Sequence, residues 1–268
     1  MAKIQHIKHG DPVNDCGKCH IFVRVVWNSC RIAYRGGIRM ELSMNERAKI
    51  IAQTTNRSLS FKGVTMIRVS TEYFDVELTN NRMAELRINS SIRMEVGSFL
   101  NHSSNTLYRQ AIRDYRYSQI NGFPFHPYEA VLNYTVTYNE SCHLSYYHDR
   151  YEYTGGAHGI TARGSETWDL NTGWRVPLSS FFKQGTDYQR YVTERIIEQA
   201  EKNMAENPGI YFEDYKKLIV QNFNPNSFYI TPQGVVVYYQ QYDIAPYASG
   251  IVEFLLPYDE NVKKPNCG

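Results

Sequence analysis

The stretch that decides the fold is residues 131–153, VLNYTVTYNESCHLSYYHDRYEY, where tyrosine and β-branched residues recur at alternate positions. The side chains that share one face of its first half are Tyr134, Val136 and Tyr138. A period-two pattern of this kind is typical of a half-buried strand. Asn139 to Ser141 are turn residues, and the segment from Cys142 onward returns as a partner strand. The stretch therefore predicts an antiparallel hairpin.

Further strands and two helices follow this hairpin. Residues 161–168 and 174–176 flank DLNTG at 169–173, a hairpin connection with glycine where a positive φ is required. A helix is predicted over 187–204, because its apolar residues recur at helical spacing. These residues are Tyr188, Val192, Ile196, Ala200 and Met204. A shorter helix is predicted at about 212–222.

The last strands are predicted at 228–231, 235–242 and 251–256. Regular alternation of strand and helix is missing, so the pattern indicates an α+β fold with a mainly antiparallel sheet and helices packed on it. We expect the strands around 131–153, 161–176 and 228–256 to form one sheet, with the 187–204 helix packed against it.

The first half of the chain is less regular. Residues 21–27 read as a strand, and Ser43 followed by Glu46 has the spacing of a capping box, which predicts a helix to about Thr54. Residues 64–78 alternate in period two and predict one or two strands. Two helices should follow, with one-faced apolar stripes. Their stripe residues are Ile88, Ile92, Val96, Phe99 and Leu100 in the first, and Leu107, Ala111 and Tyr115 in the second.

Asn121-Gly122, Pro124 and Pro127 mark the expected boundary between two sub-domains. The predicted division is an N-terminal extension at 1–60, a smaller α+β domain at 61–125 and a C-terminal α+β domain at 126–268.

Composition excludes several classes of protein. A net charge of +2 without a dense basic stripe argues against nucleic-acid binding. No stretch reaches the length of apolar sequence that a membrane span requires. The first residues carry no apolar core of a secretory signal, so we expect either a cytoplasmic protein or one whose export segment lies outside this sequence.

The five cysteines are Cys16, Cys19, Cys30, Cys142 and Cys267. Their distribution does not resemble a disulfide framework and favours a reducing compartment. Cys16, Cys19 and His20 spell CxxCH, which leaves three interpretations open. Ordinary thiols are preferred; a zinc site would use these three residues with Cys30, and c-type haem attachment is the third interpretation. No other cofactor is expected.

Four motifs occur in a fixed order along the second half of the chain. They are YEYTGGAHG at 151–159, WDLNTG at 168–173, PLSSFF at 177–182 and YDIAPYASG at 242–250. Their words and spacing resemble the C-terminal domain shared by RsiV-type anti-sigma factors and PdaC-type peptidoglycan deacetylases. The segment before them, with Phe123-Pro124-Phe125, is similar to the smaller domain that precedes it in those proteins.

The resemblance implies a recognition module, which in the RsiV branch binds host-type lysozyme. No sigma-binding segment, membrane span or separate deacetylase domain is visible in this sequence, so neither family's whole activity is carried over.

Two loops are the candidate binding site. In the first, paired glycines follow a tyrosine-rich strand and expose backbone N–H groups. In the second, Pro246 fixes the chain and Tyr247 offers a rigid aromatic contact. The site residues are Tyr153, Gly155, Gly156, His158, Pro246, Tyr247 and Ser249. The alternative reading is structural: a plain turn in which His158 caps a carbonyl, and a Tyr247 that folds back onto the sheet.

We therefore expect a non-catalytic module that binds a protein, with lysozyme as one possibility, or a cell-wall-related ligand. The competing hypotheses are a hydrolase that uses His143, His148 and His158, and an intracellular protein of unknown role in a spore-forming bacterium. No GxSxG or HExxH motif is present, which argues against an enzyme.

Overall fold

The computed structural model describes residues 31–33, 39–41 and 46–267. The chain divides into two compact units between Ser43 and Met44. In the first unit, β1 (Arg31–Ala33) pairs antiparallel with β2 (Arg39–Glu41). The strand predicted at 21–27 lies outside the described residues. None of the described helices is long and apolar enough to span a membrane.

The described part of the second unit contains two sheets, and the larger has the order β3-β4-β5-β6-β7. Its strands are β3 (Lys49–Phe61), β4 (Val64–Glu77), β5 (Tyr128–Glu140), β6 (His143–Tyr153) and β7 (Ile160–Asp169). Neighbouring strands are antiparallel except β4 and β5, which are parallel because a helical crossover joins them. The predicted hairpin at 131–153 is confirmed as β5 and β6.

The helix predicted at 43–54 is wrong, because its second half belongs to β3. This strand pairs with β4 along its whole length, from Lys49 opposite Glu77 to Phe61 opposite Val64. Lys62 and Gly63 both have a positive φ and form the tight turn between the two strands. A long hairpin ladder therefore outweighs a local helical spacing.

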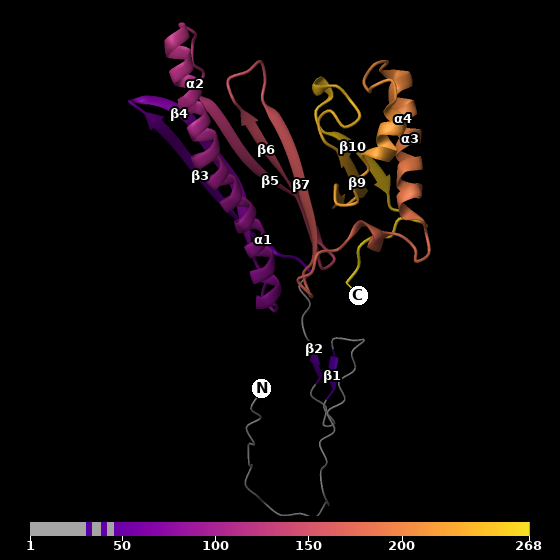
Figure 1. The fold of residues 1–268 in the computed structure, drawn as a ribbon. Coiled ribbons are helices and arrows are strands. Elements are labelled where there is room, and N and C mark those ends of the chain that lie inside the picture. The colour runs from indigo at the N-terminus through magenta and orange to yellow at the C-terminus, as the bar shows by residue number, and fades with distance from the viewer. Residues whose placement is uncertain (1–30, 34–38, 42–45, 268) are drawn as a thin grey trace, which may run out of the picture. The chain divides into compact units, whose positions relative to one another are not determined.

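The crossover between β4 and β5 consists of α1 (Arg82–Asn101), a π-helical stretch η1 (His102–Leu107) and α2 (Tyr108–Asn121). The Asn81 side chain caps α1 by accepting a hydrogen bond from the Ala84 amide, at 3.0 Å. The crossover lies along one face of the larger sheet (Figure 1). The two predicted helices are confirmed. The predicted stripe residues that are buried are Ile88, Ile92, Val96, Phe99, Leu107 and Ala111.

The smaller sheet has the order β10-β9-β8 and is antiparallel. Its strands are β8 (Phe228–Thr231), β9 (Gly234–Tyr239) and β10 (Val252–Pro257). The helices α3 (Tyr188–Glu206) and α4 (Tyr215–Gln221) lie beside it (Figure 1), and short 3₁₀ turns occupy Leu178–Phe181 (η2) and Tyr247–Ser249 (η3). As predicted, Val192 and Ile196 of α3 are fully buried in the core of this layer.

The prediction that all the later strands form one sheet is wrong. Strand β8 packs against one face of β5, β6 and β7 instead of extending the sheet at its edge. The Ile230 amide donates to Ser145 Oγ at 3.1 Å, and Ser165 Oγ donates to the Phe228 carbonyl at 2.5 Å. The free edge of β7 is covered by side chains: the Thr161 and Arg163 amides donate to glutamine carbonyl oxygens. A further strand therefore has no open ladder there.

The expected sub-domain boundaries do not coincide with the cores of the structure. Residues 49–60 belong to the same hairpin as β4, and β5 pairs with β4 across residue 125. One hydrophobic cluster runs from Ala48 to Leu170, and a second is formed mainly by Leu178 to Val262. The two layers therefore divide near residues 170–178, so the α+β class with two sub-domains holds with a later boundary.

Candidate functional site

The first candidate loop, residues 154–159, connects β6 to β7. Gly155 has φ of +85° and Gly156 is exposed, so the paired glycines turn the chain at the surface. The side chain of His158 is exposed, and its Nδ1 lies 3.1 Å from the carbonyl oxygen of Gly159. Tyr153 closes β6 opposite Glu129 and is half-buried. His158 therefore makes the contact with a backbone carbonyl that the structural interpretation of this loop predicted.

The second candidate loop, residues 245–250, connects β9 to β10 and is fixed at several points. Pro246 precedes η3, and Ser249 Oγ donates to the Ile210 carbonyl at 2.9 Å. Just before the loop, Gln240 accepts from the Arg163 amide at 2.9 Å and returns a hydrogen bond to the Arg163 carbonyl at 2.7 Å. Ser249 fixes the loop to the segment that follows α3, and Gln240 fixes the chain just before the loop to β7. The conformation of the loop is therefore pre-organised.

The two loops meet through their aromatic side chains. The rings of His158 and Tyr247 are stacked, with centroids 3.8 Å apart and an interplanar angle of 22°. Tyr242 lies beside Tyr247, with the centroids of the two rings 6.0 Å apart. We call His158, Tyr242 and Tyr247 the aromatic cluster. The predicted proximity of the two loops is confirmed.

The side chains of the aromatic cluster differ in exposure. His158 and Tyr242 are exposed, whereas Tyr247 is half-buried. Tyr247 therefore stands neither free at a loop tip nor folded back into the sheet; it supports the imidazole of His158. Tyr151 of β6 lies nearby, and its pKa is raised, chiefly by burial and then by the neighbouring Glu129 and Tyr247.

The three histidines of the hydrolase alternative are not brought together. His143 Nδ1 lies 2.7 Å from the Ser141 carbonyl, and His148 faces α1, where its Nε2 lies 3.8 Å from Glu95 Oε1. His143 and His148 are five residues apart on β6, so they point to opposite faces of the sheet. His158 belongs to the aromatic cluster. Within the described part of the chain, no three His, Cys, Asp or Glu side chains could hold a metal.

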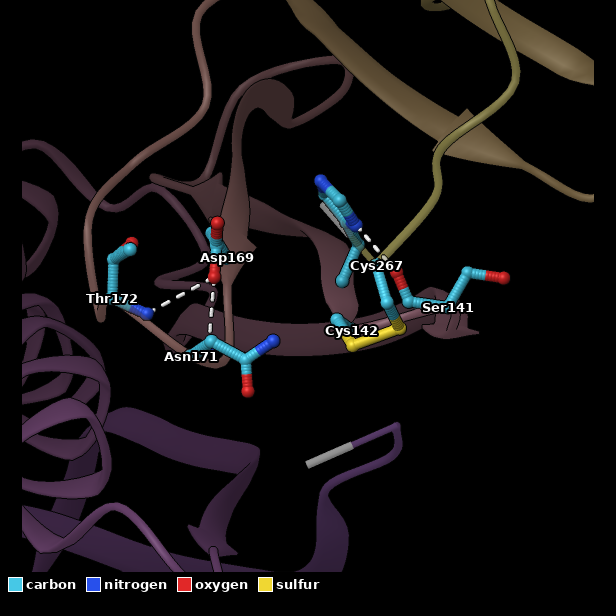
Figure 2. Close-up of a disulfide and its surroundings, with 7 residues drawn as sticks. Ser141, Cys142, Asp169, Asn171, Thr172 and Cys267 are labelled. Atoms are coloured by element: carbon cyan, nitrogen blue, oxygen red, sulfur yellow. Dashed lines mark hydrogen bonds between the residues drawn. A yellow bond between two sulfur atoms is a disulfide. The ribbon is translucent and has the colours of Figure 1, made fainter. Parts of the chain in front are cut away.

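The proposed zinc ligands Cys16, Cys19, His20 and Cys30 lie outside the described residues. The other two cysteines correct the sequence-based interpretation. Cys142 and Cys267 form a disulfide, with Cα atoms 5.2 Å apart (Figure 2). A disulfide favours an oxidising compartment, the opposite of what the cysteine spacing suggested. Because 125 residues separate the partners, spacing along the chain carried no signal of this pair.

Arg163 is a positioning residue that the sequence analysis missed. Its backbone makes two hydrogen bonds to Gln240, which lies just before the 245–250 loop, and its guanidinium lies 3.8 Å from the centre of the Tyr147 ring. The register of β6 and β7 places Asp149 directly opposite Arg163. Aligning the two strands outward from their connecting turn would have revealed this pair of opposite charges.

Two family models match the chain. The model described as "Deacetylase PdaC" matches residues 65–161, and the model described as "Protein of unknown function (DUF3298)" matches residues 179–259. No curated protein matches the chain.

Two crystal structures share the fold. A member of the DUF3298 family from Bacteroides fragilis NCTC 9343 is 19% identical, with a TM-score of 0.64 over 83% of this chain and 96% of that one. A DUF3298 family protein from Pseudomonas aeruginosa PAO1 is 17% identical, with a TM-score of 0.50 over 79% of this chain and 90% of that one. The sequence predicted this pair of domains in this order, from the segment with Phe123-Pro124-Phe125 for the smaller domain and from the four motifs for the C-terminal one. The motif at 151–159 lies within the PdaC match and not within the DUF3298 match. The chain thus carries a PdaC-type domain followed by a DUF3298 domain.

Proposed function

We propose that this chain is a non-catalytic binding module, and that the aromatic cluster formed by His158, Tyr242 and Tyr247 is the centre of its contact surface. The partner is a protein or a cell-wall-related ligand. The observation that carries the proposal is the stack of His158 on Tyr247, which joins two loops from different sheets.

The physical support is pre-organisation. Aromatic side chains give a large contact area for few rotatable bonds, and they are enriched among the residues that contribute most to binding. The Tyr247 ring lies against the rings of His158 and Tyr242, with centroids 3.8 and 6.0 Å away, and Ser249 anchors its loop to Ile210. The side chains of this surface are therefore already ordered by the fold, and binding a partner costs less conformational entropy.

The resemblance to RsiV-type anti-sigma factors makes a c-type lysozyme the first partner to test. The experiment immobilises the chain and measures lysozyme binding by surface plasmon resonance. Tyr247→Ala should weaken binding by about 2 kcal/mol or more, because it removes the anchor and releases His158. Circular dichroism should show an unchanged fold, since Tyr247 is only half-buried.

The matched control is Tyr117→Ala, which removes a tyrosine that is 64% exposed on α2 and belongs to the other layer. Its binding should equal that of the unmodified chain. Lysozyme binding that survives both Tyr247→Ala and His158→Ala would remove the aromatic cluster from the contact surface. No binding at high micromolar lysozyme would exclude lysozyme as the partner.

A further inference from the structure

The two sheets in the described part of the second unit end in four outer strands, which are β3, β7, β8 and β10. Three of these edges are closed by side chains. Glutamine side chains bond the outward amides of β7, and serine side chains bond the outward backbone groups of β8. At β10, the Leu255 carbonyl accepts from Gln199 Nε2 at 3.1 Å, and Pro257, which has no N–H, ends the strand.

The fourth edge, that of β3, is open. This strand has 13 residues and is the outermost strand of the larger sheet (Figure 1). Near its C-terminal end, Tyr108 Oη donates to the Ser60 carbonyl at 2.9 Å. Among the described residues, no hydrogen bond reaches the outer backbone of β3 from Ile50 to Leu59. Alternate residues of an edge strand direct their N–H and C=O groups outward, so a ladder is available there for another strand.

The side chains of β3 also leave this edge accessible. Residues 50–56 contain no charged residue and no proline. Ile50 and Ile51 point to opposite faces of the strand, and they are 36% and 37% exposed. An exposed edge strand of this composition pairs readily with a strand from another chain.

The charged side chains of β3 are Lys49 and Arg57, and both are basic. They are eight residues apart, so they lie on the same face of the strand. Lys49 is paired with Glu77 at 2.8 Å. Arg57 is exposed and makes no ion pair or side-chain hydrogen bond with a described residue. A second copy of β3 would bring only further basic charge to this edge, whereas a strand with an acidic residue would be attracted to it.

A hollow of about 510 Å³ begins at β3 and extends over β4 and β5. Two cross-strand rows of side chains line it, with Asn56, Ser70 and Val131 in one row and Ser58, Arg68 and Glu129 in the next. The charges within it are balanced, since Arg68 Nη1 lies 4.0 Å from Glu129 Oε1. Its walls are therefore suited to uncharged polar side chains of an added strand, and pockets of this kind give strand addition its selectivity.

We propose that β3 is a docking edge for an extended acidic segment of a partner protein, which adds to the larger sheet as a further strand. Main-chain hydrogen bonds along residues 50–58 supply the affinity. An acidic residue opposite Arg57 and apolar residues opposite Ile50 and Ile51 supply the selectivity. This edge contains no residue of the aromatic cluster, so it is a second contact surface.

The test uses the full chain and a fluorescent peptide in anisotropy titrations. The peptide is aligned antiparallel to residues 50–58, with glutamate opposite Arg57, valine opposite Ile50 and Ile51, and threonine elsewhere. It should bind with a Kd of about 100 μM or tighter. A second peptide has proline at two adjacent central positions, so it lacks at least one N–H that would face β3, and it should bind about tenfold more weakly or worse. Equal binding of the two peptides would overturn the proposal, because main-chain pairing would then contribute nothing.

Hydrogen exchange locates the bound peptide. The glutamate peptide should slow exchange of the amide protons of β3 and leave those of β10 unchanged. Protection at β10 or β7 in place of β3 would refute the docking edge. The absence of binding at about 1 mM peptide would refute it as well.

A charge reversal tests the acidic character of the partner. Arg57→Glu should weaken the glutamate peptide by about fivefold or more and should strengthen a peptide with lysine in place of glutamate. The melting temperature should not fall, because Arg57 is exposed and has no partner among the described residues. The matched control is Lys202→Glu, which reverses an exposed charge on α3 and should bind both peptides as the unmodified chain does. An unchanged preference of Arg57→Glu for the glutamate peptide would contradict an acidic partner.

Sedimentation equilibrium tests the other possible occupant, a second copy of this chain. The unmodified chain should remain a monomer up to about 100 μM. A dimer that Ile51→Lys abolishes would assign β3 to self-association and overturn the proposal. Tyr247→Ala should bind the glutamate peptide normally, so failure of the docking edge can be told apart from failure of the aromatic cluster.

Discussion

Arg163 makes two parallel hydrogen bonds to the carboxylate of Asp149, with Nε–Oδ1 and Nη2–Oδ2 distances of 2.7 Å each. The guanidinium also pairs with Glu253 of β10, so it joins the two sheets through side chains. Burial alone would lower the pKa of Arg163, but hydrogen bonding to Asp149 and the charges of Asp149 and Glu253 outweigh burial and raise it. The guanidinium therefore stays charged in a site where its side chain is only 9% exposed.

Arg163→Lys should destabilise the protein by about 1–3 kcal/mol, because lysine keeps the charge but loses the two-point contact and the stacking on Tyr147. Chemical denaturation measures the loss. The matched control is Arg190→Lys, which alters an exposed pair with Glu194 on α3 and should cost less than about 0.5 kcal/mol. Equal effects of the two variants would contradict a special role for Arg163.

The disulfide between Cys142 and Cys267 closes a loop of 125 residues in sequence and ties the C-terminal segment to the β5–β6 turn. The turn is fixed on both sides, since the Cys142 amide donates to the Glu46 carbonyl and its carbonyl accepts from the Leu170 amide. Cys267→Ser should lower the free energy of unfolding by about 2–5 kcal/mol, mainly by relaxing the unfolded chain. A thermal melt with and without a thiol reductant checks this. Reductant should shift the unmodified protein and leave Cys267→Ser unchanged.

Gly173 ends the DLNTG turn with φ of +67°. The Asp169 side chain organises this turn by accepting from the Asn171 and Thr172 amides at 2.8 and 3.0 Å (Figure 2). A Cβ atom on Gly173 would lie 2.5 Å from Ala84 Cα, so Gly173→Ala combines backbone strain with a clash against α1.

The expected loss for Gly173→Ala is more than about 2 kcal/mol in a denaturant titration. Gly185→Ala separates the two causes. Its φ is +84°, and no atom lies within 4 Å of the added Cβ, so only the backbone term of about 1 kcal/mol applies. If both variants lose the same stability, the contact with Ala84 contributes nothing.

The sequence predicted the elements whose pattern is local. Alternation over 131–153 predicts the β5–β6 hairpin, and the spacing of Val192, Ile196 and Ala200 predicts the buried face of α3. The proximity of the two candidate loops was also predictable, and the loops contact each other through the stacked rings of His158 and Tyr247.

The failures share one cause, which is that the deciding contact is distant in sequence. Residues 49–54 fit a helical spacing, yet their partner on β4 makes them a strand. The smaller sheet stays separate because the side chains of Gln240 and Gln241 occupy the edge of β7. The sequence of β7 itself does not predict these hydrogen bonds. The grouping of Glu95, His148 and Glu166 is equally hidden, since these residues come from three elements that only the fold brings together.

The last prediction concerns acid. The pKa of His148 is lowered from 6.5, chiefly by burial and also by the charge of Arg150, against the opposing charges of Glu95, Glu166 and Asp149. The folded state therefore binds fewer protons at this group than the unfolded chain does once the pH falls below about 6.5. The contribution of His148 to stability is complete above that pH and is lost as the pH falls below it.

His148→Phe removes this proton-linked loss, so its free energy of unfolding should fall less than that of the unmodified protein between about pH 7.5 and 5.5. Urea titrations at several pH values measure the two slopes. His126→Phe, at an exposed position, is the matched histidine-to-phenylalanine control. Parallel slopes for His148→Phe and the unmodified protein would mean that His148 has the same pKa in the folded and unfolded states, which would contradict the lowered pKa.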